Sequence, residues 1–202
     1  MLFRSGIYLA LYAKEGRFTS IVRQAVDALN GTPSIVFGLF GMSVFVLAFG
    51  WGYSLIAGAF TLALMVLPVI IKTTEEAVRA VPANLMQASM AMGSSKWQAI
   101  YKVVLPAALG GVITGLILSL GRTAGETAPI MFTAAVAIRS TTSISLFEPV
   151  MSLSYHLYYL AMDVPQAITN TYGTALILMG IVLFMFLLAS LVRYHYSKHN
   201  RW

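Results

Sequence analysis

Arg122 and Glu126, near the end of a long apolar run, are the residues of this sequence best suited to chemistry at a fixed site. They stand four positions apart, so on a helix they share one face. The planar guanidinium of arginine can donate two parallel hydrogen bonds to an oxyanion, whereas a carboxylate repels one. The pair predicts an anion site in which Glu126 holds Arg122 in place or competes with the anion for it. The alternative is an ion pair that only locks two helices together.

Thr123 and Thr127 flank this pair, and their hydroxyls could donate to the same anion. Capping of helix ends is the alternative role for threonines at such positions. An ionisable side chain that faces lipid costs roughly 2.5–3.5 kcal/mol on insertion scales. We therefore expect the pair to face a cavity or a partner subunit. Small residues form rows that let a second helix approach closely, namely Gly111, Gly115 and Ser119 and, one residue off that register, Gly121 and Gly125.

The composition is that of an integral membrane protein. Of the 202 residues 58% are hydrophobic and 10% are charged, and the mean hydropathy is +0.80, whereas soluble domains are about 25% charged. The absence of cysteine excludes disulfides, thiolate catalysis and Cys-ligated metals. With no metal-spaced histidine pair and no nucleophile–base set, the sequence predicts no catalytic residue, no metal ligand and no cofactor.

Four apolar segments are long enough, or nearly so, to cross a bilayer, which takes about 20 residues. We place all-α spans at residues 33–49, 53–71, 103–121 and 172–192. The first is the shortest. Between the first two, the sequence Gly50–Trp51–Gly52 predicts a tight turn at the membrane interface.

These four spans assign the loops to sides of the membrane. Segments 14–31, 72–102 and 193–202 must share one side, and they carry ten of the thirteen Lys and Arg residues. By the positive-inside rule this side is cytoplasmic. The net charge of +6 thus indicates cytoplasmic loops rather than nucleic-acid binding. The C-terminus is expected in the cytoplasm, and residues 127–171 form an external region.

The N-terminal part is predicted to be a helix stub followed by a surface helix. Residues 6–13 are apolar but too few to span a membrane. We interpret them as the cytoplasmic end of a helix whose beginning is missing, in an N-terminally truncated chain. A signal peptide is the alternative, but no cleavage site is evident. Residues 14–31 alternate apolar and charged positions as an amphipathic cytoplasmic helix does.

The cytoplasmic loop, residues 72–104, contains signals for several helix ends. Thr73 with Glu76 and Ser95 with Gln98 match the capping-box pattern S/T-x-x-E/Q. Pro82 can begin a helix and Gly93 can end one in the left-handed conformation. We expect three short helices.

The middle helix, residues 82–92, is rich in methionine, which is frequent at surfaces that dock partners. An equally good explanation is that these residues pack against the protein's own helix bundle. The relevant side chains are Leu85, Met86, Met90 and Met92.

The stretch QASMAMGSSKWQAIYKVVLP resembles the EAA loop of ABC importer permeases. Matching positions are Ala88, Gly93, Leu105 and Pro106, while Gln87 replaces the Glu, Ser89 the second Ala and Val103 the Ile. The resemblance implies that this loop enters a groove on a separate ATPase and transmits its closure to the membrane helices. The chain has no G-x-x-x-x-G-K-[ST] motif. It is therefore expected to be a non-catalytic subunit, with ATP hydrolysis on a partner chain.

Three further stretches narrow the resemblance to the phosphate-specific, Pst-type permeases: TTEEAVRAVPANLMQASMAMG, GRTAGETAPIMFTAA and GTPSIVFGLFG. The ending GETAP is similar to the A-type rather than the C-type permease. The resemblance implies a MetI-like, type I ABC importer permease domain over residues 1–202, in which one span and most of another are absent. It also places Glu75, Glu76 and Arg79 in the coupling loop.

The family implies a multi-pass protein of a prokaryotic inner membrane that transports phosphate. Its partners would be a homologous permease subunit, an ATP-binding subunit dimer, an extracytoplasmic phosphate-binding protein and membrane lipid. The alternatives are a permease for another oxyanion, the C-type sister, or an autonomous channel or secondary transporter. The last would require internal repeats, and none is evident.

Overall fold

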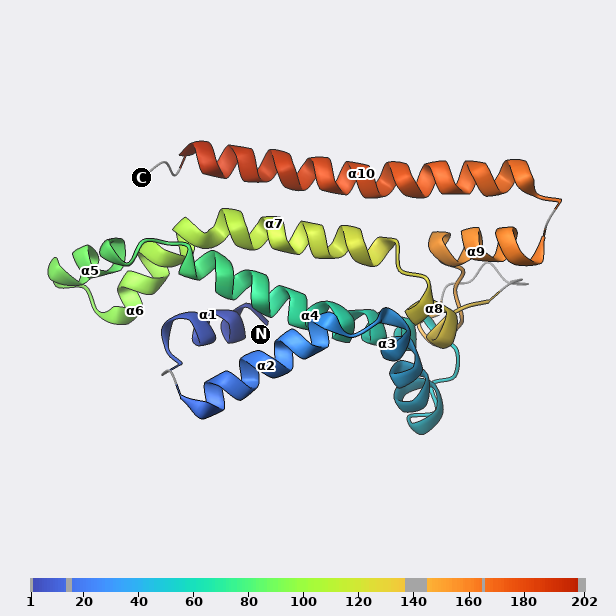
Figure 1. Ribbon diagram of the computed structural model, residues 1–202, viewed down its shortest axis with the longest axis horizontal. Coiled ribbons are helices and arrows are strands. Elements are labelled where there is room, and N and C mark those ends of the chain that lie inside the picture. Colours follow the sequence, from blue (N-terminus) through green and yellow to red (C-terminus); the bar gives the residue numbers. More distant parts are fainter. Residues whose placement is uncertain (1, 14–15, 137–144, 165, 200–202) are drawn as a thin grey trace. The chain divides into compact units, whose positions relative to one another are not determined.

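The computed structural model describes residues 2–13, 16–136, 145–164 and 166–199, without the side chains of 2–4 and 196–199. Helices are the regular secondary structure of these residues (Figure 1). In chain order they are α1 (Leu2–Leu11), α2 (Arg17–Gly31), α3 (Ser34–Gly41), η1 (Met42–Ala48), α4 (Leu55–Arg79), α5 (Ala83–Ala91), α6 (Lys96–Ala99), η2 (Ile100–Val104), α7 (Leu105–Ala124), α8 (Ala128–Thr133), α9 (Leu153–Asp163) and α10 (Ile168–His199). Part of the predicted external region, residues 137–144 and 165, lies outside the described residues.

Three helical stretches of the described chain are long and apolar enough to cross a membrane. They are Leu55–Arg79, the joined helices Lys96–Ala124, and Ile168–His195. The predicted first span corresponds to α3 and η1, which follow α2 at a bend of 97°. If this bent pair counts as one span, the total is four.

The chain forms two compact units by contact, and each is described separately. The first comprises Met1–Ala28, Leu67–Ser119 and Met185–Trp202, and the second Leu29–Val66 and Leu120–Phe184.

The core of the first unit lies where α7 packs against the end of α4. Val78, Val104, Ala108 and Val112 are buried there. A Cβ atom on Gly115 would lie 2.7 Å from the Thr73 side chain, and one on Gly111 would lie 2.9 Å from Ala77. The predicted close approach of a second helix is confirmed at Gly111 and Gly115, and that helix is α4. At Gly125 it is wrong, because a Cβ atom there would meet only the Arg122 carbonyl oxygen of its own turn, at 3.5 Å.

The predicted capping box at Thr73 and Glu76 is wrong, because α4 continues unbroken to Arg79. The Thr73 hydroxyl donates to the Ile70 carbonyl at 3.3 Å, as a residue within a helix does. Pro68 lies one turn before residue 72, inside α4, and does not end the helix. Thr73 and Thr74 instead serve packing, since they fill the space beside Gly115 and Gly6.

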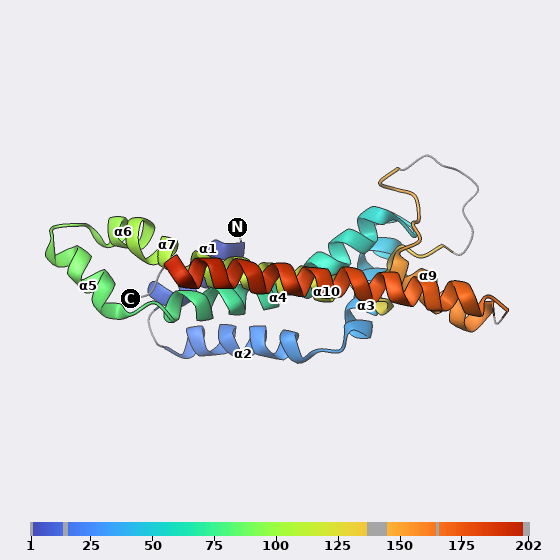
Figure 2. The same cartoon turned by 90° about the horizontal axis from the view of Figure 1, so that it is seen from above.

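The second capping box is confirmed. The Gln98 amide donates to Ser95 Oγ at 3.3 Å, and the Ser95 amide donates to Gln98 Oε1 at 2.9 Å. Gly93 has the predicted left-handed φ of +88°. Pro82 is the N-cap of α5 rather than its first residue. In Figure 2, α5 and α6 lie at the same end of the first unit.

The helix that begins at Lys96 does not stop at Pro106, contrary to the expectation of three separate short helices. It passes through the π-helical segment η2 and continues as α7 to Ala124. A proline inside a helix removes one hydrogen bond and crowds the carbonyl four residues earlier, here that of Lys102. The wider π geometry of Ile100–Val104 coincides with that position, so Pro106 is accommodated without a break.

Replacing Ser95 with alanine should destabilise the start of α6 by about 1 kcal/mol, because one helix donor loses its acceptor. Amide hydrogen exchange at Gln98 should accelerate about fivefold. The matched control is Ser20→Ala, an exposed serine within α2, which should leave exchange at Gln98 unchanged. Equal exchange at Gln98 in the wild type and in Ser95→Ala would contradict the capping role.

In the second unit, α3 packs closely on α8. A Cβ atom on Gly38 would lie 3.0 Å from the Ala128 carbonyl oxygen. Beside this contact, Phe45 stacks on Trp51 with ring centroids 5.5 Å apart. Gly50 and Gly52 have φ of +68° and +63°, so the predicted tight turn is confirmed.

The segment after residue 145 closes the N-terminal end of α4. The amide of Leu55 donates to the Glu148 carbonyl at 2.8 Å, and that of Ile56 to the Leu146 carbonyl at 2.9 Å. Further on, α9 and the first turns of α10 are joined by Thr174 Oγ1 and His156 Nδ1, 3.3 Å apart. The described part of the predicted external region, residues 127–171, includes the helices α8 and α9 and the first residues of α10.

Candidate functional site

Arg122 and Glu126 form the predicted pair. Arg122 Nε lies 3.5 Å from Glu126 Oε1. The helix α7 ends at Ala124, between the two residues of the pair. The chain turns there, as the amides of Gly125 and Glu126 donate to the carbonyls of Arg122 and Thr123, both at 3.1 Å. This turn keeps the two side chains on one side, so the i, i+4 pair survives the end of the helix.

The two partners differ sharply in exposure. The Arg122 side chain is 58% exposed and that of Glu126 is 15% exposed. At 3.5 Å the contact is longer than the 2.7–2.9 Å of a charge-assisted hydrogen bond. Since a guanidinium carries five N–H donors, this single loose contact leaves Arg122 with donors for a further acceptor.

The backbone at Glu126 is held by the beginning of α9. The hydroxyl of Ser154, which is buried, donates to the Glu126 carbonyl at 2.9 Å. Ser152 caps α9 by accepting from the Tyr155 amide at 3.2 Å, and its hydroxyl lies 3.1 Å from that of Ser154. The sequence analysis missed both serines. The preference for serine at N-caps could have identified Ser152, but no local signal links Ser154 to a residue 28 positions away.

Thr127 is the N-cap residue of α8, yet its side chain makes no capping hydrogen bond. Thr123 lies half-buried on the last turn of α7. Both threonines therefore stay within one turn of Arg122 and Glu126, as their spacing requires. Their contact with an anion stays a prediction.

A second group of charges ties three helices of the first unit together. Glu75 Oε1 lies 2.9 Å from Arg23 Nε and 3.0 Å from Arg79 Nη2. Arg23 also donates to the Leu9 carbonyl at 3.0 Å, and Lys72 pairs with Asp27. The Glu75 side chain is only 12% exposed. α1, α2 and the end of α4 are thus joined through charged side chains.

The residues expected in the coupling loop divide into two sets. Glu75 and Arg79 belong to the charged group just described, whereas Glu76 is exposed. On α5, Gln87 and Ala88 are exposed, and Ser89 bonds to Ser94 at 2.8 Å. Leu105 and Pro106 open α7 rather than closing a loop. The role of the coupling-loop residues in docking an ATPase stays a prediction. The ion pairs of Arg23 with Glu75 and of Lys72 with Asp27 were not predicted from the sequence.

Replacing Glu75 with alanine should lower the free energy of unfolding by about 1–3 kcal/mol, because two arginines lose their common acceptor. Chemical unfolding of the chain in detergent micelles measures this. Glu76→Ala is the matched control, since Glu76 is exposed and its loss should change stability by less than about 0.5 kcal/mol. Equal losses in the two variants would show that the ion pairs contribute nothing.

Residues 3–200 match the family of binding-protein-dependent transport system inner membrane components, and the chain belongs to this family. Its expected fold class, an all-α polytopic membrane protein with a MetI-like bundle, is confirmed by this match together with the helices described above.

Several curated relatives are similar in sequence. The probable ABC transporter permease protein YqgI of Bacillus subtilis is 35% identical over 194 residues, which cover 89% of this chain and 66% of the relative. The phosphate transport system permease protein PstA of Haemophilus influenzae is 39% identical over 161 residues, or 78% of this chain and 55% of the relative. The phosphate transport system permease protein PstA 2 of Mycobacterium bovis is 35% identical over 199 residues, which cover 98% of this chain and 65% of the relative. The chain thus spans between about half and two thirds of the length of these relatives.

A similar fold occurs in a chain of the MetNI methionine ABC transporter, solved in inward-facing conformations. The TM-score is 0.77 with 18% sequence identity, and the match covers 97% of this chain and 86% of that one.

Proposed function

We propose that this chain is the permease subunit of an ATP-driven phosphate importer and forms half of the translocation pathway. The family match and the PstA relatives support an importer of this kind. The observation that carries the substrate class is Arg122: an exposed guanidinium at the end of a membrane-spanning helix, positioned but not satisfied by Glu126. Such a group can donate to two oxygens of one phosphate.

The remaining parts of the machine are partner chains. A homologous permease would complete the pathway, an ATP-binding subunit dimer would dock on α5 and the neighbouring coupling residues, and an extracytoplasmic phosphate-binding protein would deliver the substrate. The exposed side chains of Gln87, Met90 and Met92 on and beside α5 offer a docking surface. In this proposal ATP hydrolysis takes place on the partner, and closure of the ATPases is transmitted through α5 and α6 to α7.

The proposed orientation places the C-terminus, α2 and residues 72–104 in the cytoplasm, and residues 127–171 outside. The distribution of Lys and Arg supports it. Arg122 then lies toward the external end of its span, where phosphate arrives from the binding protein.

Reconstitution tests the proposal. The chain is co-produced with an ATPase and a second permease of a phosphate importer. Proteoliposomes are supplied with the phosphate-binding protein and assayed for uptake of radiolabelled phosphate. We expect uptake that requires ATP and is reduced by excess phosphate but not by sulfate or molybdate. Uptake by the chain without an ATPase would exclude this function, and preferential competition by another oxyanion would reassign the substrate.

A further inference from the structure

A large apolar cavity of about 1130 Å³ opens in the first unit between α1, α2 and the α6–η2 segment. Among the described residues, none that lines it is charged. We name it the aromatic groove, after the lining residues Tyr8, Tyr12, Phe18, Trp97 and Tyr101. Its volume lies slightly above the range of about 300–1,000 Å³ typical of ligand pockets.

Two stacked aromatic pairs face this groove from different helices. The rings of Tyr8 and Tyr12 on and after α1 have centroids 6.3 Å apart, and those of Trp97 and Tyr101 have centroids 6.4 Å apart. These four side chains and Phe18 are all exposed. Tyrosine and tryptophan favour the level of lipid headgroups, where one edge of the ring is apolar and the other is wet.

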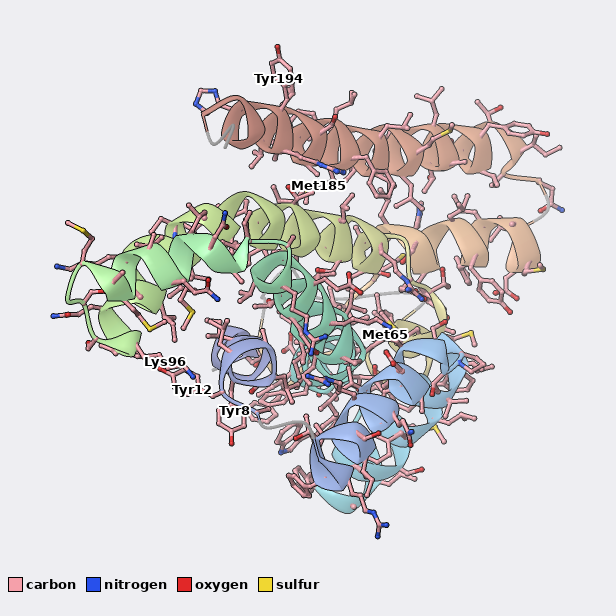
Figure 3. All side chains as sticks on the ribbon, turned by 60° about the vertical axis from the view of Figure 1, so that its left-hand side comes forward. Tyr8, Tyr12, Met65, Lys96, Met185 and Tyr194 are labelled. Atoms are coloured by element: carbon pink, nitrogen blue, oxygen red, sulfur yellow. The ribbon has the colours of Figure 1, made fainter. Side chains whose placement is uncertain are left out.

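The positive charge of Lys96 lies at the margin of the aromatic groove. Lys96 Nζ is 4.7 Å from the centre of the Tyr12 ring and donates to the Leu11 carbonyl at 3.1 Å, and Figure 3 shows Lys96 beside Tyr12 with Tyr8 close by. Arg17 directly precedes Phe18, and Lys102 directly follows Tyr101; both are exposed. Each of the three cations thus adjoins an aromatic lining residue in sequence.

We infer that the aromatic groove binds an anionic phospholipid, with an acyl chain in the apolar interior and the phosphate at Lys96. A free phosphate has no apolar part to fill the interior, and a zwitterionic lipid leaves the positive margin without a net counter-charge. The cytoplasmic leaflet is rich in anionic lipid, so the inference rests on the proposed function only for the side of the membrane on which these helices lie.

Quenching of Trp97 fluorescence by brominated lipid tests the site. Trp51→Phe and Trp202→Phe remove the other two tryptophans of the chain. In nanodiscs of mixed composition, we expect brominated phosphatidylglycerol to bind about fivefold or more tightly than brominated phosphatidylcholine, since each cation near an anionic headgroup contributes about that factor. Because both leaflets have the same composition, the assay does not depend on orientation.

Two variants and one control complete the design. Lys96→Gln should lower the preference for phosphatidylglycerol about fivefold. Val22→Phe, which fills the groove from α2, should weaken quenching by both lipids. Arg193→Gln is the matched control, because it removes the same charge from α10 and Arg193 does not line the groove; its lipid preference should equal that of the wild type.

Equal quenching by the two lipids in the wild type would mean an ordinary lipid annulus and would overturn the inference. Absence of quenching by either lipid, unchanged in Val22→Phe, would mean that protein covers the groove and would overturn it as well. A chain that transports phosphate in the reconstituted system but shows either result retains its proposed function and lacks only the lipid site.

Discussion

Replacement of Arg122 by lysine is expected to lower ATP-driven phosphate uptake by about 10- to 100-fold, with assembly and binding to the ATPase unchanged. Lysine keeps the charge but loses the planar fork that can hold two phosphate oxygens at once. A hydrogen bond to a charged group contributes about 1.5–3 kcal/mol, which corresponds to that range. Since 58% of the arginine side chain is exposed, the substitution removes little packing. Uptake in proteoliposomes and copurification of the ATPase measure the two expectations separately.

Glu126→Gln separates the two roles proposed for the carboxylate. If Glu126 holds Arg122 in place, uptake falls as in Arg122→Lys. If it competes with the anion, the KM for phosphate falls because the competitor has lost its charge. Arg193→Lys, on a helix that is exposed along most of its length, serves as the control for a change of cation elsewhere. Wild-type uptake in both Arg122→Lys and Glu126→Gln would leave the pair with a purely structural role.

The helical architecture follows from local features of the sequence. Apolar runs of span length predict α4, α7 and α10, and the all-α class follows from them. Turn residues act locally too, so Gly50, Gly52 and Gly93 have the positive φ that their positions require. The same holds for the capping box at Ser95. Each of these features depends on residues within a few positions of one another.

The failures have one physical cause, which is that tertiary packing decides between local alternatives. The residue pattern at Thr73 suits either a helix cap or a packed position inside a helix. The close contact of Thr73 with Gly115 favours the packed position. Pro106 alone predicts a helix end, but the wider π geometry of η2 accommodates the proline within a continuous helix. The pairs Arg23–Glu75 and Ser154–Glu126 join residues 52 and 28 positions apart, and single-sequence periodicity carries no information at that separation.

The packing of the small residues could be predicted only in part. Their spacing predicts that a helix approaches closely, but only the structure shows which helix and at what distance. The tightest approach of all is at Gly41, which the sequence did not single out: a Cβ atom there would lie 2.1 Å from Thr61 Oγ1 and 2.9 Å from Thr61 Cβ. Its φ is −60° and its ψ is −40°, a conformation open to any residue. Glycine is therefore required at position 41 for space and not for backbone freedom.

Gly41→Ala is expected to destabilise the chain by about 1–3 kcal/mol, the typical result of overpacking a filled interior. Thr61 cannot yield easily, because it is buried and its hydroxyl donates to the Ala57 carbonyl at 2.8 Å. Unfolding in detergent micelles measures the loss. The matched control is Gly180→Ala in α10, where a Cβ atom would meet nothing within 4 Å. There the higher helix propensity of alanine should stabilise the chain by up to about 1 kcal/mol.

A double variant identifies the cause of the loss. Thr61→Ala removes the hydroxyl and the methyl group that a Cβ at position 41 would strike, but it leaves Thr61's own Cβ position 2.9 Å away. Gly41→Ala combined with Thr61→Ala should therefore regain part of the stability that Gly41→Ala loses. Strictly additive effects would show that the two positions do not touch. Opposite signs for the two glycine variants, with partial recovery in the double variant, would establish that steric contact at Thr61 sets the distance between these helices.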